Sequence, residues 1–301
     1  MNGSQGPSSG TARHHVVSRG YQRLFADGEQ IRRVEKTTRR AIIVGTRDAF
    51  VERHFNSWED NEGNRDDELE HQWSVRENEC LPVLRSLVAG RDTSAGAREA
   101  VKIVAAIHFS RSYAFAEVQQ RIAEEVTDQH AASADGRDHL RAAFREQEGR
   151  DPYPGEIAAA VRRGAEAQFG GRRQLIRDMA YAYNRALEMM TPLFVQLVWK
   201  HRPFIDFVFG DHPVVHSDRR RVGLRQLPLG EATRIFMPLS STVGALFTTR
   251  QTADIGVAPA VIQRLNLQTW QAAERYIAGH PSTELSASLA MNITDHAGQR
   301  R

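Results

Sequence analysis

The sequence predicts an α+β protein in which strands from both ends of the chain pack with a central block of α-helices. Short β-prone runs separated by turns fill residues 14–55, helical periodicity fills 67–199, and β-branched and aromatic runs return from residue 204. Runs of strands beside a run of helices are typical of α+β proteins. We therefore expect a single interlocked domain over residues 13–279.

The N-terminal strands are predicted from two β-prone runs bounded by turn-forming residues. Gln30–Val34 follows Asp27-Gly28, and Ala41–Val44 is followed by Gly45. This arrangement predicts a β-hairpin or a small meander.

Four helices are predicted in the middle of the chain. They cover residues 67–90, 97–126, 155–169 and 172–200. Gly90 ends the first, and Pro192 predicts a kink or a break in the fourth. Residues 128–154 are polar and contain Asp-Gly and Pro-Tyr-Pro-Gly turns, so we expect a mobile insertion there.

Strand signals return in the C-terminal part of the chain. Predicted strands cover Phe204–Gly210, Thr233–Met237 and Thr242–Thr248, and a last helix covers Pro259–Ile277. Residues 1–12 and 280–301 lack apolar periodicity, so both are expected to be disordered tails.

Composition excludes several classes of protein. The chain has 301 residues, 41% of them apolar and 26% charged, as in ordinary soluble domains. Cys80 is the only cysteine, which excludes a disulfide framework and a zinc ribbon. No window approaches the roughly 18–20 apolar residues of a membrane span, and no secretory leader is visible. We expect a cytoplasmic protein without a membrane partner.

The basic charge is weak evidence for nucleic-acid binding. The net charge is +3, and only three of the 40 basic residues are lysines, so 40 − 3 = 37 are arginines, against 37 acidic residues. Arginine can hold a phosphate or a carboxylate in a planar fork, so this composition permits an anion site. Nucleic acid stays an alternative partner.

Charged residues occupy the apolar stripes of two predicted helices. One stripe comprises Leu69, Trp73, Glu77, Cys80, Leu84 and Leu87. The other comprises Val101, Val104, His108, Arg111, Phe115, Val118 and Ile122. Helical spacing places each set on one buried face. Because an isolated buried charge costs several kcal/mol, we expect Glu77 and Arg111 to interact.

The buried charges allow two interpretations. A buried ion pair that fixes helix register is favoured slightly over a catalytic or ligand-binding pair. His108 fits a core histidine better than a functional one.

A second group of polar residues follows the predicted strand that ends at Gly210. Asp211 and His212 enter a turn fixed by Pro213, and His216 follows. A carboxylate at a strand end is often functional, and these residues could ligate a metal, although the spacing matches no established metal motif. The alternative is that Asp211 caps its own turn.

His14 and His15 form a third candidate group. Adjacent residues of a strand point to opposite faces, so at most one of the two histidines can join a site. Cys80 is expected to be buried and inert, and neither a Gly-x-Ser-x-Gly elbow nor a glycine-rich phosphate loop occurs.

The ordered motifs resemble those of the bacterial domain-of-unknown-function family 4238 over about residues 14–277. The opening segment His14–Phe25 lacks the proline found in that family's segment. Similar landmarks follow in the same order: the helix with Glu68 and Glu77, His108–Arg111, Phe207–Val214, Met237–Ser240 and Leu265-Asn266. The family has no agreed activity, so the resemblance implies landmarks and no reaction.

The polar landmarks that the resemblance implies are His15, Glu77, Arg111, Asp211 and Asn266. They include the two stripe charges and the strand-end carboxylate, which predicts one shared polar centre. This centre would bind a small anionic ligand or be structural. The alternative is a hydrolase of nucleic-acid or nucleotide phosphoesters. In it His15 would be the acid or base, Glu77 and Asp211 would position water or a metal, Arg111 would neutralise charge and Asn266 would orient the substrate. Cofactor and metal are left open.

Overall fold

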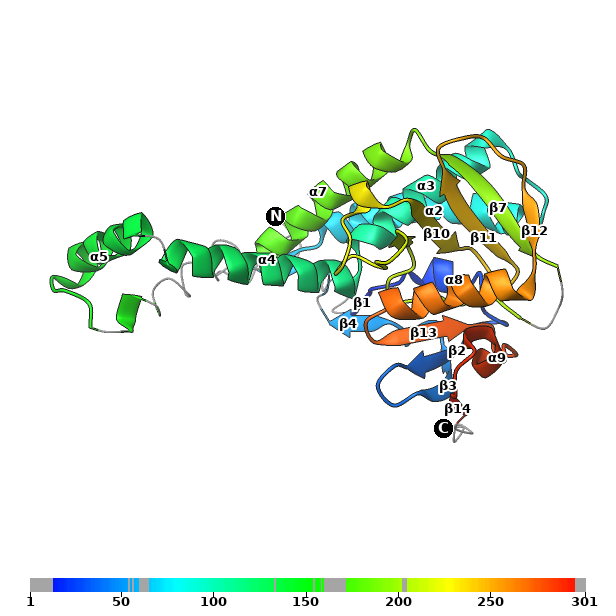
Figure 1. Ribbon diagram of the computed structural model, residues 1–301, viewed down its shortest axis with the longest axis horizontal. Helices are drawn as coiled ribbons and strands as arrows, with labels where there is room; N and C mark the ends of the chain where they lie inside the picture. The colour runs from blue at the N-terminus through cyan, green and yellow to red at the C-terminus, as the bar shows by residue number, and fades with distance from the viewer. Residues whose placement is uncertain are drawn as a thin grey trace, which may run out of the picture.

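Figure 1 shows a computed structural model of the chain, which confirms the α+β class through two five-stranded sheets packed with helices. The structure describes residues 13–53, 55, 57–59, 65–132, 134–153, 155–157, 159, 172–201 and 205–295. The expected tail at residues 1–12 lies outside these ranges. None of the described helices is long and apolar enough to cross a membrane.

The first sheet, here called the central sheet, has the strand order β12-β7-β11-β10-β9. Its strands are β7 (Phe194–Lys200), β9 (Val215–Ser217), β10 (Arg234–Pro238), β11 (Val243–Thr248) and β12 (Ile255–Val257). All neighbours are antiparallel except β12 and β7. The strands expected near 233–237 and 242–248 are thereby confirmed.

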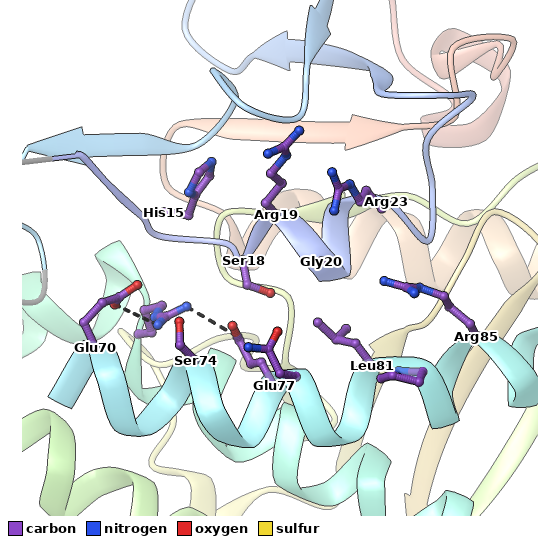
Figure 2. A pocket seen from close by; sticks show the side chains of 13 residues that line it. His15, Ser18, Arg19, Gly20, Arg23, Glu70, Ser74, Glu77, Leu81 and Arg85 are labelled. Atoms are coloured by element: carbon purple, nitrogen blue, oxygen red, sulfur yellow. Dashed lines mark hydrogen bonds and ion pairs between the residues drawn. The ribbon is translucent and has the colours of Figure 1, made fainter. Parts of the chain in front are cut away.

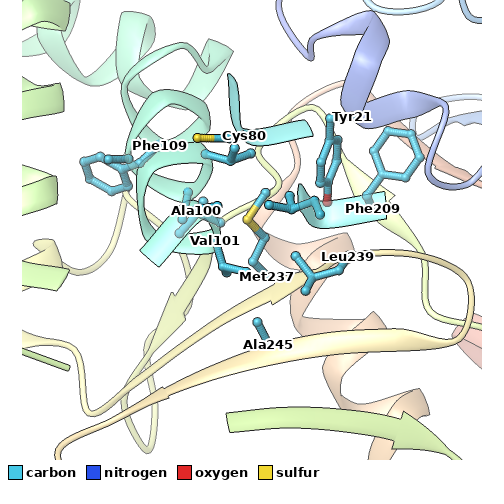
Figure 3. Close-up of a cluster of buried hydrophobic side chains, with 14 of the residues drawn as sticks. Tyr21, Cys80, Ala100, Val101, Phe109, Phe209, Met237, Leu239 and Ala245 are labelled. Atoms are coloured by element: carbon cyan, nitrogen blue, oxygen red, sulfur yellow. The ribbon is translucent and has the colours of Figure 1, made fainter. Parts of the chain in front are cut away.

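The central sheet is apolar on both faces because its strands alternate between two cores. Ile235 and Met237 of β10 join the largest hydrophobic cluster, whereas Phe236 between them joins the cluster beneath the helix α8 (Pro259–Ala272). Figure 3 shows the first of these cores, where Met237 lies near Val101 of a covering helix. This period of two is what a strand buried on both faces requires.

The second sheet, here called the terminal sheet, joins the two ends of the chain. Its order is β14-β3-β2-β13-β8. Its strands are β2 (Gln30–Glu35), β3 (Arg40–Gly45), β8 (Phe209–Gly210), β13 (Tyr276–Gly279) and β14 (Thr294–Asp295). The predicted hairpin is therefore confirmed, and the late strand β13 pairs directly with β2.

Shorter elements complete the N-terminal and C-terminal parts. They are β1 (Arg13–His15) paired with β4 (Val51–Arg53), β5 (Trp58–Glu59) paired with β6 (Arg65–Asp66), α1 (Arg19–Gln22), the 3₁₀ helix η1 (Leu229–Glu231) and α9 (Leu285–Leu289).

The helical block covers one face of the central sheet and extends into an arm. Its helices are α2 (Glu68–Val88), α3 (Ala95–Ser110), α4 (Tyr113–Ala132), α5 (Ala134–Glu148) and α7 (Arg172–Met190). Figure 1 shows α2, α3 and α7 beside the sheet, while α4 and α5 project away from it. Most of the predicted helix 155–169 lies outside the described residues.

The predicted long helix 97–126 is wrong in one respect, because it breaks at Arg111-Ser112. The Ser112 hydroxyl accepts a hydrogen bond from the backbone N–H of Phe115 at 3.1 Å and starts a new helix, α4. A serine side chain that caps a new helix competes with continuation of the old one. The apolar stripe consequently ends near Phe115, and Ile122 on the arm is 45% exposed.

The predicted helix 172–200 is wrong beyond Met190, where the chain turns through Pro192 and continues as β7. The break predicted at the proline is present. Val195 and Leu197 then alternate with the residues between them and pack in the core on the helical side. The segment pairs with β11 over six residues, and this pairing makes it a strand although its apolar periodicity is helical.

Two further C-terminal predictions need correction. Only Phe209–Gly210 of the predicted strand 204–210 pairs in a sheet, and 202–204 lie outside the described residues. Residues 280–295 contain α9 and β14, with Leu285 and Leu289 buried, in place of the expected tail. Within the insertion expected at 128–154, residues 128–153 contain the end of α4 and all of α5.

The short helix α1 lies closely against α2 at Gly20. A methyl group on Gly20 would lie 2.2 Å from Cδ1 of the buried Leu81. Tyr21, next to it, is fully buried and donates a hydrogen bond from its hydroxyl to the carbonyl oxygen of Pro238. These two contacts hold α1 in place over the helical block.

We predict that Gly20→Ala lowers the free energy of unfolding by about 1–3 kcal/mol, because the added methyl overpacks the α1–α2 contact. Urea denaturation measures this change. Gly96→Ala is the matched control: Gly96 lies in α3 with its nearest neighbour at 3.8 Å, so alanine there is expected to be neutral or stabilising. Equal stability of Gly20→Ala and the wild type would contradict the close contact.

Candidate functional site

A pocket of about 420 Å³ opens between α1 and one face of α2 (Figure 2). It is lined by His15, Ser18, Arg19, Gly20, Arg23, Glu70, Ser74, Glu77, Asn78, Leu81, Pro82, Arg85 and Arg111. Its volume lies in the range typical of small-molecule sites. Three of the five predicted centre residues, His15, Glu77 and Arg111, line this one pocket.

The floor of the pocket is built on Arg111, which lies at the break between α3 and α4. Its side chain is 1% exposed and contacts two carboxylates of α2. Nη2 lies 2.8 Å from Oε2 of Glu70, and Nη1 lies 3.4 Å from Oε1 of Glu77. The guanidinium also stacks over the Trp73 ring, 4.9 Å from its centroid. The predicted contact between Glu77 and Arg111 is confirmed.

Glu77 occupies an environment that disfavours its charge. Burial raises its pKa, while the Arg111 guanidinium and the hydroxyl of Ser18 oppose that rise. Nε2 of His108 lies 3.9 Å from Glu77. Glu77 thus links the α1 segment, α2 and α3 at one buried point.

His108 is a core residue, as expected. Its ring is fully buried, lies 4.7 Å from the Tyr21 ring between centroids, and has no hydrogen-bond partner on either nitrogen within the described chain. Burial lowers its pKa well below the usual range, with Arg111 adding to that effect. His108 is therefore neutral.

The two adjacent histidines point to different places, as a strand requires. His14 is buried, with Nε2 3.8 Å from a carboxylate oxygen of Asp67. His15 is half-buried and lines the pocket, with Nε2 3.2 Å from the carbonyl oxygen of Thr46. Burial lowers the pKa of His15, so it contributes a neutral ring.

The rim of the pocket carries three more arginines. Arg19 and Arg23 share Glu29, at 3.1 and 2.6 Å, and the hydrogen bond from Arg23 lowers the pKa of Glu29 to about 2. Arg85 stands opposite on α2 (Figure 2). Its side chain makes no ion pair or hydrogen bond with any residue that the structure describes.

Asp211 lies outside the pocket and holds the backbone. Its buried carboxylate accepts hydrogen bonds from the N–H groups of Glu274, Arg275 and Tyr276 at 2.6–2.9 Å. Burial raises its pKa, and these donors oppose the rise. The prediction that Asp211 caps its own turn is wrong, because it caps the segment that follows α8. The N–H groups of this segment bind Asp211 and not the helix carbonyls, so the helix predicted to reach Ile277 ends at residue 272.

Asn266 also lies outside the pocket. Its amide accepts from the backbone N–H of Val208 and donates to the carbonyl oxygens of Asp206 and Ser288. All these partners are backbone groups, so Asn266 clamps α8 to the segment before β8 and to α9. The predicted five-residue centre is consequently divided: three residues share the pocket, and Asp211 and Asn266 are structural clamps elsewhere.

The histidines after Asp211 form a separate buried group. The rings of His212 and His216 are 6.0 Å apart and both contact Phe109. Burial lowers the pKa of His212 to about 3 and also lowers that of His216. Within the described residues, no group of three or more His, Cys, Asp or Glu could hold a metal ion. The suggested metal ligands therefore do not assemble.

The family resemblance is confirmed by comparison with family models. A model described as a protein of unknown function, DUF4238, matches residues 13–283. The chain belongs to the DUF4238 family. Curated proteins and solved structures show no match to this DUF4238 chain. The family assignment thus adds no activity to the geometry of the pocket.

The sequence prediction missed the pocket face of α2 in this DUF4238 protein. Glu70, Ser74, Glu77, Leu81 and Arg85 all line the pocket. They step by 4, 3, 4 and 4, which is helical spacing on one face. This stripe shares Glu77 with the apolar stripe, and its helical spacing is the signal in the sequence for the pocket face.

We predict that the buried histidines make this DUF4238 chain sensitive to acid. Their folded pKa values lie below those of unfolded histidine, so the unfolded state binds protons first as the pH falls. Stability is therefore full above about pH 6.5 and declines below it, by up to about 1.4 kcal/mol per pH unit for each histidine. Urea denaturation at several pH values between 7 and 5 measures the slope.

His212→Phe tests the origin of that slope, because it replaces a ring that has no hydrogen-bond partner in the described chain. We expect the slope of unfolding free energy against pH to become shallower, because one of the contributing histidines is gone. Phe109→Leu perturbs the same cluster without removing a titratable group and should shift the curve in parallel. Parallel curves for His212→Phe and the wild type would rule out His212 as a source.

Proposed function

We propose that the pocket between α1 and α2 binds a small anionic molecule. Four arginines and two glutamates line it, an excess of 4 − 2 = 2 positive charges. Counting Glu29 behind the rim, the balance is 4 − 3 = 1. The positive charge lies at the rim, where three arginines and Glu29 give 3 − 1 = 2, whereas the floor has 1 − 2 = −1. The rim guanidinium of Arg85, which has no partner within the described chain, is the observation that carries the proposal.

The other three arginines support binding in different ways. Arg19 and Arg23 are held in position by Glu29, and together they still attract an anion to the rim. Arg111 is paired with Glu70 and Glu77, so it shapes the floor of the pocket and adds little attraction for an anion. An anion is therefore best placed near the rim, where guanidinium forks can bind phosphate or carboxylate oxygens in pairs.

The hydrolase alternative has less support. That mechanism needs Asp211 beside Glu77 and Asn266 beside the substrate, whereas backbone groups elsewhere occupy both side chains. His15 is the one predicted acid or base in the pocket, and the two lining carboxylates, Glu70 and Glu77, are both engaged with Arg111. Binding therefore explains the pocket with fewer requirements than catalysis.

We predict that inorganic phosphate binds to the pocket and that Arg85→Ala weakens this binding about tenfold or more, since hydrogen bonds to charged groups contribute roughly 1.5–3 kcal/mol. Isothermal titration calorimetry at low and high salt measures the affinity, which should fall with salt.

Arg91→Ala is the matched control for this experiment. Arg91 is exposed just after α2, outside the pocket lining, and its replacement changes the net charge by the same amount. We expect it to bind phosphate as the wild type does. Equal losses in the two variants would mean non-specific attraction, and a wild type that binds no phosphate would contradict the proposed function.

A further inference from the structure

The pocket face of α2 carries three polar side chains without partners. Ser74, Asn78 and Arg85 line the pocket, and none of their side chains makes a hydrogen bond or ion pair within the described chain. Together they offer a hydroxyl, an amide and a guanidinium to whatever enters. Such groups fix the orientation of a ligand in a pocket.

These three side chains lie in a row along the helix. Ser74 and Asn78 are four residues apart and Arg85 follows seven residues later, so all three share a face. At a rise of 1.5 Å per residue, Asn78 and Arg85 are separated by about 10 Å along the axis. Leu81 lies between them in the sequence, and Figure 2 shows Gly20 of α1 on the opposite side of the pocket from Leu81.

The two ends of this row differ in charge. Arg85 and Arg23 face each other across one end, and Figure 2 shows the Arg85 side chain extending back over α2 toward Leu81. At the other end, Glu70 and Glu77 are already neutralised in part by Arg111. That end keeps a formal charge of 1 − 2 = −1, which disfavours a second anion, and its carboxylates can accept hydrogen bonds from ligand hydroxyls.

The lining lacks the large aromatic rings on which bases are most often stacked. Among the residues that line the pocket, none is Phe, Tyr or Trp. Proteins that bind bases commonly stack them on aromatic rings, with each stack contributing about 1–3 kcal/mol. A base could stack here only on His15 or on an arginine, so a nucleotide is expected to gain less from its base than a sugar phosphate gains from its hydroxyls.

We infer that the ligand is a polyhydroxylated phosphate monoester of the sugar-phosphate class. The inference rests on the proposed anion binding. The phosphate lies between Arg85 and Arg23, where guanidinium groups bind its oxygens. The hydroxyls lie toward Ser74 and Asn78, whose hydroxyl and amide both donate and accept hydrogen bonds, and toward the carboxylate of Glu70.

Calorimetric titration of the full chain with four probes tests this assignment. The probes are inorganic phosphate, glucose 6-phosphate, glucose and adenosine monophosphate. We expect glucose 6-phosphate to bind about tenfold tighter than phosphate, as two additional hydrogen bonds would give. Glucose alone should bind too weakly to measure, and adenosine monophosphate should gain less over phosphate than glucose 6-phosphate does.

Variants separate the two ends of the pocket. Ser74→Ala combined with Asn78→Ala should reduce the advantage of glucose 6-phosphate over phosphate to about threefold or less. Arg85→Ala should weaken both probes. Asn184→Ala removes an exposed asparagine of α7, outside the lining, and should change neither affinity. Thermal melts confirm that each variant is folded.

The outcomes distinguish this inference from the proposed function. Equal affinities for phosphate and glucose 6-phosphate, or an advantage that survives Ser74→Ala with Asn78→Ala, would overturn the sugar-phosphate assignment and leave anion binding intact. Tighter binding of adenosine monophosphate than of glucose 6-phosphate would replace it with base recognition. Absence of binding by every phosphate probe would overturn both proposals.

Discussion

The burial of one guanidinium is the constraint on which the helical block and the pocket depend. Arg111 is 1% exposed and lies where α3 ends and α4 begins. An unpaired charge in that position would cost several kcal/mol, so the neighbouring helix must supply carboxylates. Glu70 and Glu77, two turns apart on α2, meet this need, and Trp73 covers the guanidinium face. The register of α2 against α3 follows from these contacts.

The same contacts give the pocket its two unlike ends. Because one Arg111 is shared between two glutamates, the floor keeps a formal charge of 1 − 2 = −1, and the nearby Ser18 hydroxyl favours the charged form of Glu77. Glu29 contacts two of the three rim arginines, whereas Arg85 has no partner within the described chain, so the rim keeps 3 − 1 = 2 positive charges. A ligand would therefore meet a positive rim and a polar interior with a small negative charge. This difference in charge arises from the pairing of the side chains more than from their number.

Local periodicity predicted the parts of this protein that depend on one face of one element. The hairpin, the ends of α2 and the contact of Glu77 with Arg111 follow from spacing alone. Periodicity failed where a distant partner decides. Residues 194–200 become a strand because β11 pairs with them. Asp211 looked functional at its strand end, but its partners are backbone groups 63 to 65 residues away. No local sequence pattern tells whether a carboxylate at a strand end will contact a bound molecule or the distant backbone of the same chain.

Coupling between Arg111 and its two carboxylates is the most direct test of this account. The measurement is a mutant cycle on the free energy of unfolding, with Arg111→Met, the double variant Glu70→Gln with Glu77→Gln, and all three changes combined. Arg111→Met alone should cost about 3–5 kcal/mol, because it leaves two carboxylates without their cation, and the combined variant should recover most of that loss. Additive losses across the cycle would contradict the claim that this buried charge sets the arrangement.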